Sequence, residues 1–142
     1  MALGSEPPLV YADSSALVKL VIEEAESEAL AEWLEDEQPA LITSGIALVE
    51  VSRATAIANA GDDVRRETWR LLDSCLIVDL TDRILRTAAT LTSPAVRTLD
   101  AIHLASARNV EPDEMLAYNR RLRDAAQALG LVVIHPGIGQ AT

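Results

Sequence analysis

The chain has 142 residues, of which 49% are apolar and 24% charged, a composition that fits one folded domain with a sizeable core. No apolar run approaches the roughly 20 residues of a membrane helix, and the first residues lack the basic and apolar parts of a signal peptide. The net charge of −10 excludes a protein that coats nucleic acid by bulk electrostatics, although an enzyme that binds phosphate at one pocket remains compatible with it. Because Cys75 is the single cysteine, there is no internal disulfide, and we expect a cytoplasmic protein.

Short apolar runs alternate with helical stretches along the chain. The predicted strands are residues 9–12, 40–43, 75–79, 115–118 and 131–134. The predicted helices are residues 14–21, 24–37, 45–59, 63–74, 81–91, 99–108 and 120–129, with Ser14 as the expected cap of the first. Strands of four or five apolar residues separated by helices indicate a parallel sheet that is buried on both faces. The expected fold class is therefore α/β, a three-layer α/β/α domain with a central parallel sheet of four to five strands.

Several polar residues lie where a binding site would form in such a sheet. Asp13 follows the first strand, Asp100 begins a helix, and Asn119 follows the fourth strand. Ligands bind beyond the carboxyl ends of the strands in parallel sheets, so these residues fall at the expected edge. Glu50 lies in the apolar stretch 46–51, on a helix face that must pack against the rest of the domain.

Carboxylates that meet in space need compensation, because two of them about 4 Å apart repel by roughly 4 kcal/mol at an effective dielectric of about 20. A divalent cation relieves this repulsion, and an acidic cluster without His or Cys points to Mg²⁺, with Mn²⁺ as the alternative. Such a site can activate water and orient a phosphodiester. The competing interpretation treats Asp13 and Asp100 as helix caps, and the spacing leaves that alternative open.

Four segments resemble the motifs of one known family, in the same order and at similar intervals. These segments are residues 11–20 with Asp13 and Ser15, residues 48–51 with Glu50, residues 99–105 with Asp100 and His103, and residues 117–131 with Asn119. From about residue 9 to residue 137, the chain resembles the PIN-domain ribonuclease toxins of the VapC family, which belong to VapBC type II toxin–antitoxin systems. The resemblance implies a single PIN domain over residues 1–142, with an ordered core over about 9–137 and tails over 1–8 and 138–142. It also implies a Mg²⁺- or Mn²⁺-dependent endoribonuclease that hydrolyses RNA phosphodiesters with metal-activated water.

The resemblance assigns roles to particular residues. It places Asp13, Glu50 and Asp100 on the family's catalytic, metal-binding acids. The family often has a fourth aspartate where this chain has Asn119, which keeps an oxygen for the metal but loses the charge, so one firmly held ion is expected. Ser15 falls where the family often has a hydroxyl near the metal site, and it would bind phosphate or a metal-bound water. A hydroxyl in the first helical turn without such a role is the alternative.

Arg120 and His103 each have two interpretations. Arg120 and Arg123 begin the last helix and would bind RNA phosphates, whereas Arg120 could instead pair with Asp124 four residues on. His103 lies one helical turn after the third acid, so it could face the pocket. We expect it to be a packed, hydrogen-bonded core histidine, because a site for a hard metal ion does not need it.

The resemblance also implies partners. These are a cognate VapB-type antitoxin that inhibits the enzyme, an RNA substrate and a second copy in a homodimer. A heterotetramer or larger assembly with the antitoxin is expected, and no association with a membrane.

A phosphotransfer enzyme or a receiver domain fits the sequence poorly. A haloacid-dehalogenase-type phosphatase needs an aspartate where this chain has Ser15, and a receiver domain needs a lysine near a late strand, whereas Lys19 is the only lysine. The remaining alternative is a catalytically weak PIN domain that acts as an RNA-binding or regulatory module, and Asn119 supports it.

Overall fold

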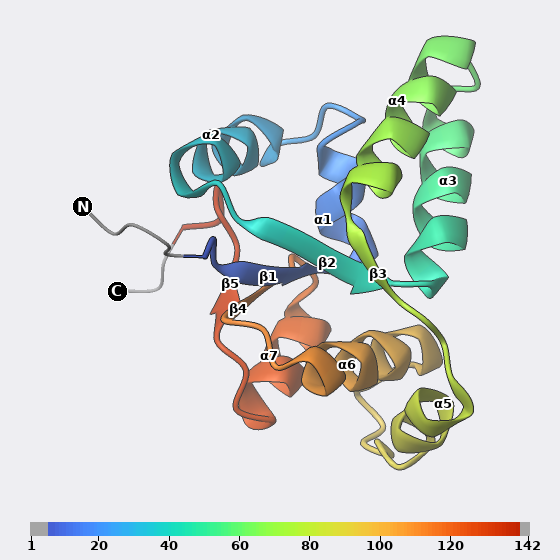
Figure 1. Ribbon diagram of the computed structural model, residues 1–142, viewed down its shortest axis with the longest axis vertical. Coiled ribbons are helices and arrows are strands. Elements are labelled where there is room, and N and C mark those ends of the chain that lie inside the picture. The colour runs from blue at the N-terminus through green and yellow to red at the C-terminus, as the bar shows by residue number, and fades with distance from the viewer. Residues whose placement is uncertain (1–5, 140–142) are drawn as a thin grey trace.

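The computed structural model describes residues 6–139, so the predicted tails lie partly outside the described residues. A central sheet carries helices on both of its faces (Figure 1). The strands are β1 Leu9–Ala12, β2 Ala40–Ser44, β3 Leu76–Val78, β4 Glu114–Leu116 and β5 Val133–Ile134. The helices are α1 Ser14–Lys19, α2 Ser27–Glu37, α3 Ile46–Ala58, α4 Asp62–Ser74, α5 Asp82–Ala89, α6 Thr98–Val110 and α7 Arg120–Ala128.

The sheet is parallel throughout, with the strand order β3-β2-β1-β4-β5. β1 is the central strand, between β2 and β4. Because side chains alternate along a strand, β1 buries Tyr11 against one layer of helices and Val10 and Ala12 against the other. A strand covered on both faces needs a run without charges, and β1 keeps such a run until Asp13.

Two helical layers cover the sheet and complete the expected three-layer α/β/α fold. Helices α1 to α4 lie over one face, and α5 to α7 lie over the other (Figure 1). Leu17, Leu30 and Val51 are buried in the first layer, and Leu104 and Leu122 are buried in the second. Across residues 6–139, no helix is both long enough and apolar enough to cross a membrane.

Several element boundaries differ from the prediction by one to three residues. The second helix was expected from residue 24 but begins at Ser27, whose Oγ accepts a hydrogen bond from the Glu24 N–H at 2.9 Å and donates to the Ile22 carbonyl at 3.2 Å. These local bonds compete with helix formation over the preceding residues. β4 was expected to reach residue 118 but ends at Leu116, after which the chain turns into the site described below.

Candidate functional site

Asp13 lies directly beyond the carboxyl end of the central strand β1 and caps the N-terminus of α1. Its Oδ1 accepts a hydrogen bond from the Ala16 N–H at 2.9 Å, and the Ser15 hydroxyl lies 2.9 and 2.8 Å from its two oxygens. The residue is only 3% exposed. Among residues 6–139, no basic side chain forms an ion pair with it, so its charge is buried with hydrogen bonds alone.

The surroundings of Asp13 oppose its ionisation. Burial raises the pKa of its carboxyl above the usual value, and the negative charge of Glu50 raises it further. His103, the Ala16 N–H and the Ser15 hydroxyl offset only part of this increase. A cation beside the carboxylate would favour its charged form.

Glu50 lies on α3, with a side chain that is 23% exposed. Its Oε1 accepts a hydrogen bond from the Ser14 hydroxyl at 2.6 Å and lies 2.7 Å from Nε2 of His103. Burial alone would raise the pKa of Glu50, but these hydrogen bonds outweigh burial and lower it. The bonds explain how an acid is accommodated in an otherwise apolar stretch of helix.

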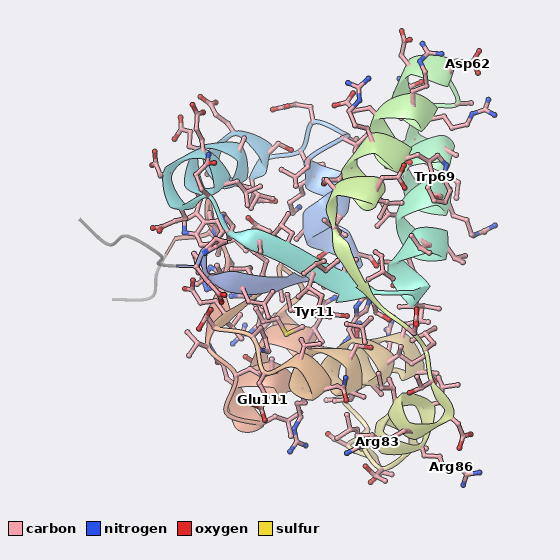
Figure 2. The ribbon with its side chains drawn as sticks, viewed as in Figure 1. Tyr11, Asp62, Trp69, Arg83, Arg86 and Glu111 are labelled. Carbon is pink, nitrogen blue, oxygen red and sulfur yellow. The ribbon has the colours of Figure 1, made fainter. Side chains whose placement is uncertain are left out.

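His103 lies on α6 and is 3% exposed, which confirms the expected buried, hydrogen-bonded histidine. Its Nδ1 lies 2.7 Å from the Tyr11 hydroxyl, and the two rings pack edge to face with centroids 5.9 Å apart. Burial, followed by the charge of Asp13, raises the pKa of Tyr11 well above its usual range, so the phenol stays protonated. Tyr11 belongs to the central strand β1 and lies near the middle of the molecule (Figure 2).

Asp100 and Asn119 both act as helix caps. Asp100 lies in the first turn of α6, where its Oδ2 accepts a hydrogen bond from the Arg97 N–H at 3.1 Å. Asn119 is the N-cap of α7, and its Oδ1 accepts hydrogen bonds from the Arg121 and Leu122 N–H groups at 2.9 and 3.3 Å. The capping alternative for Asp13 and Asp100 is therefore confirmed. Capping does not exclude a second role, because a carboxylate has further lone pairs.

The acidic residues do not form a ready-made metal cage. Within residues 6–139, no three His, Cys, Asp or Glu side chains come together as a group that could hold a metal ion. Asp13 and Glu50 are close enough for the charge of one to act on the other, whereas Asp100 is engaged by the backbone of its own helix. The donors are nevertheless oxygens, which suit a hard divalent cation, and Asp13 forms no ion pair with a basic side chain of the described residues. The assignment of Asp13, Glu50, Asp100 and Asn119 as metal ligands stays a prediction.

The arginines of α7 are placed differently from one another. Arg120 has a side chain that is 86% exposed, and its Nε lies 4.0 Å from Oδ2 of Asp124, so the alternative pairing four residues on is present. Arg123 is half-buried, and its Nε has no hydrogen-bond partner among the described residues. Phosphate binding by Arg120, Arg123 and Ser15 stays a prediction.

The roles of Ser14 and Tyr11 were not predicted from the sequence. Ser14 was expected to cap the first helix, but Asp13 does so, and the Ser14 hydroxyl donates to Glu50 instead. Tyr11 bridges to His103, which comes 92 residues later in the chain. One signal was available: a tyrosine in a buried strand needs a polar partner for its hydroxyl.

Comparison with known proteins agrees with this architecture. The PIN domain family matches residues 10–128. The chain is 43% identical to Ribonuclease VapC35 of Mycobacterium tuberculosis over 136 residues, which cover 91% of this chain and 98% of that protein. The fold of this chain is similar to that of Mycobacterium tuberculosis VapC20, which is described as a sarcin-ricin loop cleaving toxin. The TM-score is 0.72 at 17% sequence identity, and the match covers 89% of this chain and 99% of VapC20. A toxin–antitoxin complex from Klebsiella pneumoniae contains a similar chain, with a TM-score of 0.69, 22% identity and coverage of 89% and 97%. The chain therefore belongs to the PIN-domain family and, within it, to the VapC ribonucleases.

Proposed function

We propose that this protein is the toxin of a type II toxin–antitoxin pair and that it acts in the cytoplasm as a Mg²⁺- or Mn²⁺-dependent endoribonuclease. The observation that carries the metal dependence is Asp13. Its carboxylate is almost fully buried at the carboxyl end of the central strand, has a raised pKa, and has no basic partner among residues 6–139. A buried carboxylate of this kind is stabilised by a cation, and the position is where parallel sheets bind their ligands.

Asp13 would hold the ion most directly, together with Asp100, while Glu50 would bind it or orient the attacking water. To do so, Asp100 would keep Oδ2 on the Arg97 N–H and offer its other oxygen. When bound, the ion supplies positive charge against the phosphodiester and makes water a better nucleophile at neutral pH. Asn119 would contribute at most its amide oxygen, already engaged as the cap of α7, so one ion is expected to be held firmly.

Other side chains would orient the acids and the RNA. The Ser15 hydroxyl, shared between both oxygens of Asp13, orients that carboxylate and would contact a phosphate bound beside it. Arg120 is exposed and only loosely paired, so its guanidinium is free to bind a phosphate of the RNA backbone. Arg123 is half-buried on the same helix, and its guanidinium would bind a further phosphate. Attack by water on phosphorus with departure of the 3′-oxygen would leave a 5′-phosphate and a 3′-hydroxyl.

The proposed partner is a VapB-type antitoxin. The fold neighbour from Klebsiella pneumoniae was determined as a toxin–antitoxin complex, and this similarity supports a partner of that kind. The chain itself is acidic, with a net charge of −10, so a basic side chain of the antitoxin would be attracted to the acidic site. A homodimer, and a heterotetramer or larger assembly with the antitoxin, stay predictions.

The deciding experiment is cleavage of total cellular RNA by purified, antitoxin-free protein in Mg²⁺, in Mn²⁺ and in EDTA. Asp13→Asn and Asp100→Asn are the test variants. Asp62→Asn is the matched control, because Asp62 is exposed at the far tip of α4 and, among residues 6–139, pairs with Arg65 alone (Figure 2). Discrete fragments that need the ion, bear 5′-phosphates and disappear only in the two test variants would support the proposal. Cleavage that persists in EDTA would contradict the metal dependence.

The second candidate is a catalytically weak PIN domain that binds RNA or regulates a partner. The observation that favours it is Asn119, which stands where the family often has an acid and is used as a helix cap. Folded protein that binds RNA but does not cleave it under any condition would favour this candidate. In that case Asn119→Asp should restore cleavage if the missing charge is the cause.

A further inference from the structure

His103 connects the central strand to the candidate site through both of its ring nitrogens. Nδ1 lies 2.7 Å from the hydroxyl of Tyr11 on β1, and Nε2 lies 2.7 Å from Oε1 of Glu50 on α3. The edge-to-face packing of the two rings, with planes 75° apart, fixes the orientation of the imidazole. Burial on all sides removes water as a competing partner.

The chemistry of the groups determines the direction of the hydrogen bonds. A carboxylate oxygen only accepts, so Nε2 carries the hydrogen that is donated to Glu50. In the neutral ring Nδ1 is then an acceptor, and the Tyr11 hydroxyl donates to it. Ser14 closes the arrangement, because its hydroxyl donates to Oε1 of Glu50 and its oxygen lies 3.2 Å from Nε2. The result is a chain of donors that runs from Tyr11 through His103 to Glu50.

This chain of donors holds one oxygen of Glu50 and leaves the other free. Oε1 accepts from both Ser14 and His103, whereas Oε2 accepts no hydrogen bond from any residue between 6 and 139. A glutamate held by two converging donors has a fixed carboxylate plane, which an unsupported glutamate on a helix does not have. We propose that His103, held by Tyr11, is a positioning residue that fixes the Glu50 carboxylate in one orientation with Oε2 as its free oxygen.

This inference rests on the proposed function, since it assigns Oε2 to the ion or to the attacking water. A purely structural histidine would contribute to folding alone. A positioning histidine acts through Glu50, so its effect must disappear when Glu50 is already removed. That difference separates the two roles even if both destabilise the fold.

The test compares His103→Leu, His103→Gln and Tyr11→Phe in the full, antitoxin-free chain. The readouts are the Mn²⁺ dissociation constant from calorimetry, kcat for RNA cleavage, and the midpoint of thermal unfolding. Gln can still present an N–H to Glu50, whereas Leu cannot. Leu104→Ala is the matched control, because Leu104 is the buried neighbour on α6 and makes no polar contact with the site. His103→Leu is then repeated in the Glu50→Gln background.

We expect His103→Leu to weaken Mn²⁺ binding or to lower kcat by about 10- to 100-fold, the usual effect of losing a partner of a metal-site residue. His103→Gln should recover most of this loss, Tyr11→Phe should show a smaller loss, and His103→Leu should have no further effect once Glu50 is Gln. The proposal would be overturned if His103→Leu lost no more Mn²⁺ affinity and kcat than Leu104→Ala does. It would also be overturned if His103→Leu caused the same loss in the Glu50→Gln background as in wild type. If His103→Leu does not fold, Tyr11→Phe decides, and unchanged binding and kcat in that variant would overturn it.

A metal-free measurement tests the same geometry independently. The chain has two histidines, so the ring nitrogens of His103 can be assigned by ¹⁵N NMR with His135→Gln as a reference. We expect a hydrogen on Nε2 and a hydrogen-bonded acceptor at Nδ1, and the opposite tautomer would overturn the proposal. A wild-type chain that neither binds Mn²⁺ nor cleaves RNA would overturn the proposed function and this inference together, whereas active wild type with an indifferent His103 would overturn the inference alone.

Discussion

The Nε of Arg121, on α7, lies 4.0 Å from Oδ2 of Asp100, on α6. The side chain of Asp100 is 16% exposed and that of Arg121 is 38% exposed, so solvent partly screens the attraction between them. The guanidinium thus supplies positive charge beside a predicted metal ligand. A metal ion that binds Asp100 would be repelled by this guanidinium.

The Arg121 guanidinium and a metal ion would compete for the Asp100 carboxylate. Arg121→Gln should tighten Mn²⁺ binding, because it removes a repulsive charge worth about 0.2–1 kcal/mol, or up to roughly fivefold in affinity. The effect should shrink at high salt, which screens the pair. Calorimetric titration without RNA at two salt concentrations measures it. Arg120→Gln is the control, since Arg120 pairs with Asp124 on its own helix, and weaker ion binding in Arg121→Gln would contradict the competition.

Asp13→Asn should have opposite effects on activity and on stability. Cleavage should fall by at least about 100-fold, because a bound divalent ion contributes several kcal/mol to the transition state. Stability without metal should rise at pH 7, because the raised pKa of Asp13 makes its charged form unfavourable in the fold, while Asn caps α1 as well as Asp does.

The sign of the pH dependence follows from the direction of that shift. The unfolded chain ionises Asp13 near the usual 3.8, whereas the folded chain holds the proton to higher pH. Stability from this group is therefore complete below 3.8 and is lost as pH rises through the folded-state pKa. In EDTA at pH 7, the midpoint temperature of thermal unfolding should be higher for Asp13→Asn than for wild type. This difference should close toward pH 4. An equal gap at all pH values would argue against a titrating Asp13.

Asn119→Asp should strengthen metal binding without disturbing α7. Aspartate and asparagine are similar N-caps, and a negative charge at a helix N-terminus adds about 0.3–1 kcal/mol of stability. The added charge should increase Mn²⁺ affinity, measured by calorimetry. Asn119→Ser is the control that keeps a capping oxygen without the charge. If Asn119→Asp and Asn119→Ser bind the ion equally, the fourth position does not contribute to the site.

Tyr118→Phe should destabilise the fold modestly. The Tyr118 hydroxyl donates to the Pro136 carbonyl at 2.7 Å, and its loss should lower the free energy of unfolding by about 0.5–1.5 kcal/mol. The Lys19 ammonium lies 4.8 Å from the centroid of the same ring, and Phe retains that contact. Urea unfolding measures both effects, with Tyr118→Leu as the comparison that loses the cation–π contact too. A Phe variant as unstable as the Leu variant would assign the whole effect to the hydroxyl.

The fold was largely predictable, because its signals are local. The five apolar runs and the helical faces between them predicted the five strands and seven helices of the described residues, and Asp13 marked the carboxyl end of β1. The end of β4 was placed too late, since β4 ends at Leu116 and not directly before Asn119. The start of α2 was missed, because the Ser27 hydroxyl bonds to the backbone of residues 22 and 24, and side-chain bonds of this kind leave no periodic pattern.

The candidate site was predictable in composition but not in geometry. The sequence indicated that Glu50 needed a partner in its apolar surroundings, but it did not indicate which one. That partner, His103, is 53 residues away, and a helical repeat specifies a face of the helix without specifying which ring nitrogen meets which oxygen. The same holds for Asp100, whose carboxylate folds back onto its own helix.

The position of β1 at the centre of the sheet has a consequence for the order of events during synthesis. β1 carries Asp13 and is made early, but its neighbour β4 spans residues 114–116, and the Asp13 N–H itself bonds to the Leu116 carbonyl. Pairings between segments so distant in sequence form slowly and only after both have left the ribosome. The acidic edge is thus incomplete on the nascent chain until more than a hundred residues have followed Asp13.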